Sequence, residues 1–450
     1  MTHAGTNSPR GWKFVLRALR YRNYRLFFLG QAISLTGTWV QRLAMSWLIW
    51  YLTHNYWLVG MVAFLSMVPT SVLTPIAGVL IDRWERHRVI VVTQALAMVQ
   101  AFVLAGLAFG QVITPREIII LSVFLGTINA FDIPARQAFV VEMVEQREDL
   151  GNAIALNSSL FNGAQLIGPA IAAAIAGVFR GLGEVNAAGM CFLLNGVSYV
   201  GVLMALLAMR LPRRQVTSQP NKLSEDLLEG FRYMFGFPPI RAILALIATT
   251  SLFGMAYVVL MPGVAQQVYG GNMSTQGWLL SATGLGAMTG ALYLASRRRI
   301  AGLERNIPVA AAIFGLGLVG FSGTRTLWLG LGLMALAGLG RMIQTASCNT
   351  VLQTVVDDDK RGRVMALYAW TFMGMSPFGN LISGAMAEAW GAPFTIWFSG
   401  LVMLVAAGLF QLNLRRFRRL VRPIYMAQSP PPMQTGDLLG REEITPPPAK

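Results

Sequence analysis

The sequence predicts an all-α polytopic membrane protein with twelve transmembrane helices in two pseudo-symmetric six-helix bundles. The composition, the positions of charged residues between apolar runs and an internal repeat support this prediction. Of 450 residues, 54% are hydrophobic and only 12% are charged, which is more apolar than a soluble core of this size requires. A spanning helix needs ~20 mostly apolar residues, because each residue rises 1.5 Å across ~30 Å of hydrocarbon. The 46 glycines also suit closely packed membrane helices.

Hydrophobic runs bounded by charged or turn residues predict six spans in each half of the chain. In the first half they are predicted at 26–52, 57–81, 89–110, 118–137, 153–178 and 187–209. In the second half they are predicted at 240–263, 275–296, 307–323, 327–345, 363–389 and 393–414. The resulting organisation is a basic cytosolic leader, an N-terminal bundle, a cytosolic linker, a C-terminal bundle and a disordered cytosolic tail, at 1–25, 26–209, 210–239, 240–414 and 415–450.

The distribution of Lys and Arg predicts that both termini are cytoplasmic, because cytoplasmic loops keep positive charge during insertion. With the N-terminus inside, the opposite loops hold only Arg116, Arg180 and Arg325. The cytoplasmic segments hold Arg83, Arg86, Arg88, Arg147, the cluster at 210–241, Arg297, Arg298, Arg299, Arg305, Lys360, Arg361 and the cluster at 415–422. An even number of spans agrees with this arrangement.

Several function classes are disfavoured. The formal charge of +16 alternates with hydrophobic runs and does not form one basic surface, so no nucleic-acid partner is expected. Cys191 and Cys348 both lie in apolar segments, which argues against a disulfide framework or a cysteine metal site. The phosphate-cradling G-x-x-x-x-G-K-[ST] motif, the H-E-x-x-H motif and a nucleophile elbow are not found. We therefore expect neither an enzyme nor a metal or other cofactor.

The two halves repeat one another. Gly163 to Gly168 in the fifth span corresponds to Gly374 to Gly379 in the eleventh, since 374 minus 163 and 379 minus 168 both give 211. The block 151–156 matches 362–367 at the same offset. We expect these glycines, with Pro169, to form a helix-packing motif. Parallel six-span repeats are typical of one large class of secondary transporters, whose substrate site lies at mid-membrane between the halves.

The loop after the second span reads Gly78-Val79-Leu80-Ile81-Asp82-Arg83-Trp84-Glu85-Arg86-His87-Arg88 and resembles G-x-x-x-D-R-x-G-R-[RK], the signature of the major facilitator superfamily. Glu85 replaces the motif glycine, and His87 precedes Arg88. Gly168-Pro169 followed by Ala172-Ala173 resembles a degenerate antiporter motif, G-P-x-x-G-G. The segments 23–27, 132–139 and 361–365 extend the resemblance to the exporter branch that includes bacterial enterobactin exporters and drug-efflux proteins.

This resemblance implies a multi-pass protein of the bacterial inner membrane that exports a small molecule by alternating access. In that mechanism two bundles rock about a central cavity, usually driven by proton exchange. A siderophore-like or amphipathic drug-like substrate, membrane lipid as surroundings and a monomeric state are the expectations. A lipid or lysolipid flippase and a non-transporting scaffold on the same fold are the alternatives.

Asp82 is expected to act as a conformational latch. It follows the second span, where a carboxylate can meet the partial positive charge of a helix N-terminus, and the resemblance implies that this helix is the eleventh span. Such a contact would favour the outward-open state. The predicted latch residues are Gly78, Asp82, Arg83, Arg86, Asp132, Arg136, Gly362 and Arg363. The alternative is a solvated charged turn that only enforces topology.

Asp132 lies in the cytoplasmic third of the fourth span, where an acid is costly unless it is paired. Arg136 is one turn further along, and Arg83 and Arg86 are the other possible partners. Either a local ion pair or a charge relay with the Asp82 loop would satisfy Asp132.

Arg42 lies deep in the first span, where an unpaired guanidinium costs at least ~2.5–3.5 kcal/mol. A planar guanidinium binds carboxylate or phosphate oxygens, so Arg42 suggests an anionic ligand. Bonding to backbone carbonyls and snorkelling to the outer interface are the alternatives. The other cavity candidates, which could instead join helices by hydrogen bonds, are Gln41, Asn129, Asn162, Gln165 and Asn380.

Proton coupling has few candidate carriers. The carboxylates in or at the ends of the predicted spans are Asp82, Asp132 and Glu388, and all three lie near membrane surfaces. Proton coupling through Asp132, coupling to substrate charge and facilitated transport all remain open.

Overall fold

The computed structural model describes residues 16–81, 83–144, 146–209, 237–297 and 302–428, without the side chains of 147, 358, 359 and 424–428. The first half forms a short 3-10 helix, η1 (Arg17–Arg20), and six long helices. These are α2 (Arg22–Thr53), α3 (Tyr56–Ile81), α4 (Arg86–Phe109), α5 (Pro115–Glu142), α6 (Arg147–Val178) and α7 (Glu184–Leu207). A second 3-10 helix, η2 (Arg180–Leu182), connects α6 to α7.

The second half begins with a span that is interrupted by one wide turn. It consists of α9 (Pro238–Thr249), the π-helix η3 (Thr250–Gly254) and α10 (Ala256–Gln267). Five helices follow: α11 (Met273–Ser296), α12 (Leu303–Gly323), α13 (Leu327–Val355), α14 (Asp358–Trp390) and α15 (Ala392–Gln428). In the described part of the chain, ten segments are long and apolar enough to cross a membrane. The other two long helices, α2 and α14, have 32 and 33 residues, and their polar residues keep them out of this set.

Local sequence signals set several helix ends. Thr114 and Glu117 form a reciprocal capping box at the start of α5, and Asn272 caps α11 by accepting from the Ser274 amide at 3.0 Å. Gly391 has a φ of 85°, which permits the tight turn between α14 and α15. These signals explain why the helices begin and end where the hydropathy changes.

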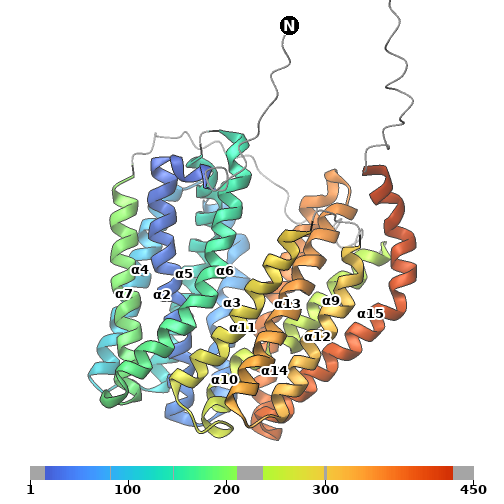
Figure 1. Cartoon of the computed structure of the whole chain (residues 1–450). Helices are drawn as coiled ribbons and strands as arrows, with labels where there is room; N and C mark the ends of the chain where they lie inside the picture. Colours follow the sequence, from blue (N-terminus) through green and yellow to red (C-terminus); the bar gives the residue numbers. More distant parts are fainter. Residues whose placement is uncertain (1–15, 82, 145, 210–236, 298–301, 429–450) are drawn as a thin grey trace, which may run out of the picture.

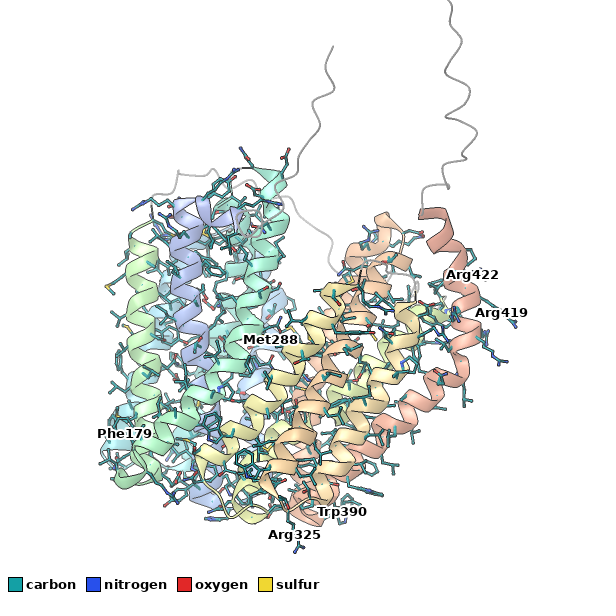
Figure 2. All side chains as sticks on the ribbon, in the orientation of Figure 1. Phe179, Met288, Arg325, Trp390, Arg419 and Arg422 are labelled. Carbon is teal, nitrogen blue, oxygen red and sulfur yellow. The ribbon has the colours of Figure 1, made fainter. Side chains whose placement is uncertain are left out.

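The helices form two bundles, as the sequence predicts (Figure 1). Helices α2 to α7 form the N-terminal bundle, and α9 to α15 form the C-terminal bundle. Figure 1 shows that the bundles touch at one end and diverge toward the other, where α2 begins and α15 ends. We name these the closed end and the terminal end. Figure 2 shows Phe179, Arg325 and Trp390 at the closed end, and Arg419 and Arg422 at the terminal end.

Both chain ends contain more helix than the hydropathy predicts. Part of the leader predicted at 1–25 is ordered, since α2 begins at Arg22 and Arg17 and Arg20 pair with Asp149 of α6 at 2.8 and 2.7 Å. Helix α15 continues to Gln428 through residues that the sequence assigns to the tail. An apolar face explains this extension, because Phe417 and Val421 are buried while the arginines beside them are exposed. The linker from 210 to 236 and the tail from 429 lie outside the described residues.

The glycine motif divides into two pairs. A Cβ on Gly168 would lie 2.4 Å from the Trp39 Cβ, and one on Gly379 would lie 2.5 Å from the Ser251 carbonyl oxygen. Gly168 therefore packs α6 against α2, and Gly379 packs α14 against η3. The contact partners repeat almost at the predicted offset, since 251 minus 39 is 212.

Gly163 and Gly374 do not fit the predicted packing motif. A Cβ on Gly163 would meet no atom within 4 Å, and one on Gly374 would meet only Trp370 of its own helix, at 3.5 Å. On their helices, Gly163 and Gly374 lie closer to the terminal end than Gly168 and Gly379 do. The two bundles are already separated there. Pro169 does lie at a contact, because its carbonyl oxygen would be 2.6 Å from a Cβ on Gly277 of α11.

Candidate functional site

The contact between α3 and α14 covers only the half of each helix at the closed end. Gly60 and Gly384 pack backbone to backbone, and a Cβ on either would lie 2.9 Å from the other's Cα. Further along, the Phe64 and Phe378 rings meet edge to face at 5.8 Å. Beyond this point Val72, Ile76 and Val79 of α3 and Trp370 and Met373 of α14 are exposed. The two helices therefore separate near the middle of their length.

The contact between α6 and α11 ends at a similar depth. A Cβ on Gly284 would lie 2.9 Å from the Leu166 Cα. Toward the terminal end, Phe161 of α6 and Leu285 and Met288 of α11 are exposed. Met288 lies on the side of α11 that faces the N-terminal bundle (Figure 2). The two helix pairs thus open together, and we name the space between them the central opening.

Arg42 lies where the bundles part. One turn closer to the closed end, Ser46 accepts a hydrogen bond from Gln276 of α11 at 2.8 Å, so this face of α2 points to the C-terminal bundle. Arg42 is on the same face and its side chain is exposed. Among the residues that the structure describes, it makes no hydrogen bond or ion pair. This position is compatible with the cavity-lining interpretation of Arg42, which stays a prediction.

Aromatic rings lie beside this guanidinium. The Arg42 Cζ is 5.1 Å from the centroid of the Trp39 ring, which meets the Phe161 ring edge to face at 6.0 Å. Trp39 is half-buried and Phe161 is exposed. Cation–π contact holds the guanidinium against an apolar wall without using any of its N–H donors. The arrangement can thus bind an anionic group next to a flat apolar one. Sequence reasoning missed Trp39 and Phe161, because aromatic residues are common in every span.

Gln41 belongs to the interior of the N-terminal bundle and does not line the opening. It is buried, donates to the Gln100 carbonyl oxygen at 2.9 Å and accepts from the Asn195 amide at 2.8 Å. Gln41 therefore joins α2, α4 and α7, which is the second of the two roles that the sequence allowed. Asn195 and Gln100 were not among the predicted residues.

The remaining amide candidates have different surroundings. Asn129 and Gln165 are half-buried, on α5 and α6. Asn162 is exposed and donates to the Ser158 carbonyl of its own helix at 3.0 Å. Asn380 lies at the contact of α14 with α3, where its amide nitrogen is 3.6 Å from the Met67 sulfur. Of these four, Asn380 lies at the boundary between the closed contact and the central opening.

Asp132 and Arg136 form an ion pair within α5, with 2.6 Å between the Arg136 Nε and a carboxylate oxygen. The other carboxylate oxygen accepts from Thr93 and Gln94 of α4, both at 2.9 Å, and Arg136 donates to Gln31 of α2 at 2.6 Å. Asp132 is only 2% exposed. Arg136, Thr93 and Gln94 thus satisfy a carboxylate that burial would otherwise penalise, and Gln31 accepts from the Arg136 guanidinium.

Asp82, the centre of the predicted latch, lies outside the described residues. Around it, Arg83 is exposed, and Arg86 of α4 pairs with Glu142 of α5 at 2.7 Å. The sequence did not single out Glu142. On the opposite bundle Arg363 is half-buried, and positions Gly78 and Gly362 both have open space where a Cβ would lie.

The π-helix corresponds, by the internal repeat, to the region of Arg42 in the other half of the chain. Position 42 moved by the 211-residue offset becomes 253, within Thr250–Gly254. Gln344 of α13 donates to the Thr250 hydroxyl at 2.7 Å and so fixes the wide turn. A π-helix inside a long helix is frequently associated with a functional site.

Two six-helix bundles with an open space between them define a transporter of the major facilitator type. The chain belongs to the transmembrane secretion effector family, whose model matches residues 15–427. It is therefore a multi-pass membrane transporter of the major facilitator superfamily, a family of proteins that are not enzymes.

Characterised relatives cover most of the chain. The staphyloferrin A transporter of Staphylococcus aureus is 23% identical over 401 residues, which are 88% of this chain and 97% of the relative. The multidrug efflux pump Tap of Mycolicibacterium fortuitum is 26% identical and shares 85% and 93% of the two chains. The enterobactin exporter EntS of Shigella boydii is 26% identical and shares 96% and 100%.

Solved structures support the fold. A bacterial homolog of the human lysosomal transporter Spinster, in an inward-facing and occupied conformation, superposes with a TM-score of 0.67 at 13% identity, over 92% of this chain and 99% of that one. The nucleoside transporter NupG superposes with a TM-score of 0.63 at 13% identity, over 89% and 98%.

Proposed function

We propose that this protein is a secondary active exporter of an anionic, siderophore-like or amphipathic drug-like small molecule. The observation that carries the proposal is the exposed Arg42 guanidinium, held against Trp39 where the two bundles part. Its free N–H donors suit a carboxylate or phenolate, and the neighbouring rings suit an aromatic or apolar group. The names of the relatives, which include a staphyloferrin A transporter and an enterobactin exporter, agree with this substrate class.

The terminal end is the cytoplasmic end in this proposal. Its loops hold most of the Lys and Arg, as cytoplasmic loops of inner-membrane proteins do. The central opening then faces the cytoplasm, from which an exporter takes its substrate. Alternating access requires a second state in which the bundles meet at the cytoplasmic end and part at the closed end.

The role of Arg42 can be tested by export from intact cells. We expect Arg42→Ala to abolish export of an anionic substrate and Arg42→Lys to retain part of it, because lysine keeps the charge and loses the planar fork. Arg116→Ala, which removes an exposed arginine at the closed end, is the matched control and should export normally. If Arg42→Ala is not inserted in the membrane, Arg42 is structural; if it is inserted and exports fully, the substrate assignment is wrong. Comparing metabolites exported by a deletion strain and its parent would supply the substrate.

The proposed latch can be tested without a substrate. Asp82→Asn removes the charge that would face the α14 N-terminus in the outward-open state. We expect spin labels on the cytoplasmic ends of the two bundles to report a larger inward-open population, together with slower export. Unchanged distances and unchanged transport would leave the Asp82 loop as a topology signal only.

Proton exchange is the proposed energy source, and Asp132 is the buried carboxylate that could carry the proton. In proteoliposomes, an imposed pH gradient should drive or inhibit substrate uptake according to its direction. Uptake that ignores the gradient in both directions would indicate facilitated transport or coupling to substrate charge.

A further inference from the structure

Glu388, near the closed end of α14, binds the other bundle with both of its carboxylate oxygens. One oxygen accepts the Tyr56 backbone N–H at 2.8 Å, and the other accepts the Asn55 side-chain amide at 3.2 Å. Tyr56 is the first residue of α3, and the Asn55 side-chain oxygen Oδ1 accepts from the Leu58 backbone N–H at 2.8 Å. Glu388 thus caps the N-terminus of a helix that belongs to the N-terminal bundle.

This geometry combines a charge with a helix end. The first N–H groups of a helix have no partner within the helix, and they carry the positive end of the helix dipole. A carboxylate accepts hydrogen bonds from these N–H groups and also interacts with the positive end of the dipole. A protonated carboxyl group loses the interaction with the dipole. The contact exists only while the bundles touch at the closed end, because its two sides lie on different bundles.

Three other contacts across this end, among the described residues, are neutral or apolar. Trp50 donates to Gln266 at 2.7 Å, Tyr56 donates through its hydroxyl to Gln267 at 2.9 Å, and Gly60 packs on Gly384. These contacts do not change their charge in the physiological pH range. Glu388 is exposed, so protons from the adjoining solvent can reach it.

The titratable groups on the elements around Glu388 are few. Tyr56 of α3 and His54 of the preceding turn are on the N-terminal bundle, while α10 presents amides and α15 begins with Ala392-Pro393-Phe394. Glu184, which begins α7 beside Trp47 and Met273, is a second acid near the contact of the bundles and has to be tested separately.

The pair formed by α3 and α14 also relates Glu388 to the proposed Asp82 latch. Asp82 follows the terminal end of α3 and is expected to face the N-terminus of α14. Glu388 precedes the closed end of α14 and faces the N-terminus of α3. The same two helices would thus carry one carboxylate latch for each state of the transport cycle.

We propose that Glu388 is the outer latch of the transport cycle, and that its protonation from the outside releases the closed end. The inference rests on the proposed function, in which the terminal end is cytoplasmic and transport proceeds by alternating access. It adds to that function a residue, Glu388, and a ligand, the proton. Ionised Glu388 holds the inward-open state. Acid on the outer side favours the outward-open state by neutralising it.

The test measures the opening of the closed end in the purified full chain reconstituted in nanodiscs. Spin labels at Val112 and Arg325, exposed positions of the two bundles at that end, report the distance between the bundles. We expect lowering the pH from neutral to ~4, where an ordinary glutamate is largely protonated, to lengthen it. Glu388→Gln should raise the population with a long distance by about tenfold at neutral pH and remove most of the pH response.

Three further variants make the result specific. Glu117→Gln removes a carboxylate on the same side that caps only its own helix, and should leave the distances and the pH response unchanged. If Glu388→Gln behaves like Glu117→Gln, the latch is refuted, and if Glu184→Gln alone removes the pH response, the proton acts at Glu184. Glu388→Asp, which keeps the charge on a shorter side chain, should retain a pH response if folding is intact.

This outcome is separable from the proposed function. The distance measurement requires no substrate, so an export failure would not affect it. A closed end that stays closed at every pH in wild type and in all four variants would refute the latch and leave the substrate assignment standing.

Discussion

Buried polar residues of the N-terminal bundle show what sequence patterns do and do not specify. The depth of Arg42 and the i+4 spacing of Asp132 and Arg136 follow from the chain alone, because they depend on position within one helix. The partners of Gln41 do not, since Gln100 and Asn195 come from α4 and α7. Which amides line a cavity and which join helices depends on the rotation of each helix, and a nearly uniform hydrophobic span does not encode that rotation clearly.

Removing one partner of the Asp132 pair should destabilise the protein. We expect Asp132→Asn to destabilise the protein by about 3–5 kcal/mol, because it leaves the Arg136 guanidinium buried without a counter-charge. Thermal unfolding in detergent measures this change. Adding Arg136→Gln should restore part of the loss, and an additive double mutant would contradict the pair as the cause.

Gln41 should matter for stability and not for substrate choice. We expect Gln41→Leu to cost roughly 1–3 kcal/mol, because it leaves Gln100 and Asn195 with unsatisfied buried groups. Asn162→Leu, which removes a bond only to its own helix, is the matched control and should melt close to wild type. A Gln41 variant with altered substrate selectivity and normal melting would place its side chain in the transport path.

At the scale of helices, the number and the order of the elements were predictable, and the irregular features were not. Apolar length and the Arg distribution predict six helices in each half. The π-helix at Thr250–Gly254 has no comparable signal, because Thr, Ser, Leu, Phe and Gly all occur in ordinary spans. The extension of α15 was missed because an amphipathic basic helix has the low hydropathy of a tail.

The glycine motif gives a matched test within single helices. We expect Gly168→Val to destabilise the protein by several degrees in melting temperature, because its side chain would overlap Trp39. Gly163→Val on the same helix should melt normally, since open space surrounds that position. The pair Gly379→Val and Gly374→Val should behave in the same way on α14. Equal effects at both positions of a helix would contradict this assignment.

At the scale of the whole molecule, the two-bundle architecture followed from the 211-residue repeat, but the state of the molecule did not. A repeat specifies equivalent halves and says nothing about the end at which they touch. The end at which they touch depends on small free-energy differences between the contacts at the two ends. The contact of Gly60 with Gly384 at the closed end is one of these contacts.

Closure of the outer end should depend on the Gly60 and Gly384 contact. We expect Gly384→Val to shift the population toward the outward-open state, because the added side chain cannot fit between the α3 and α14 backbones. The same spin labels at Val112 and Arg325 would report it, and the shift should persist at every pH. Gly408→Val, where no atom lies within 4 Å, is the control.

The wide turn η3 also has a consequence for register. A π-helix contains one residue more than the α-helical path around it, and one residue corresponds to a rotation of about 100°. Removing a single residue from Thr250–Gly254 would therefore turn all of α10 about its axis and carry Gln266 and Gln267 away from Trp50 and Tyr56. The extra residue in the middle of the span thus fixes the rotation of α10 about its axis. The contacts of α10 at the distant closed end require that rotation.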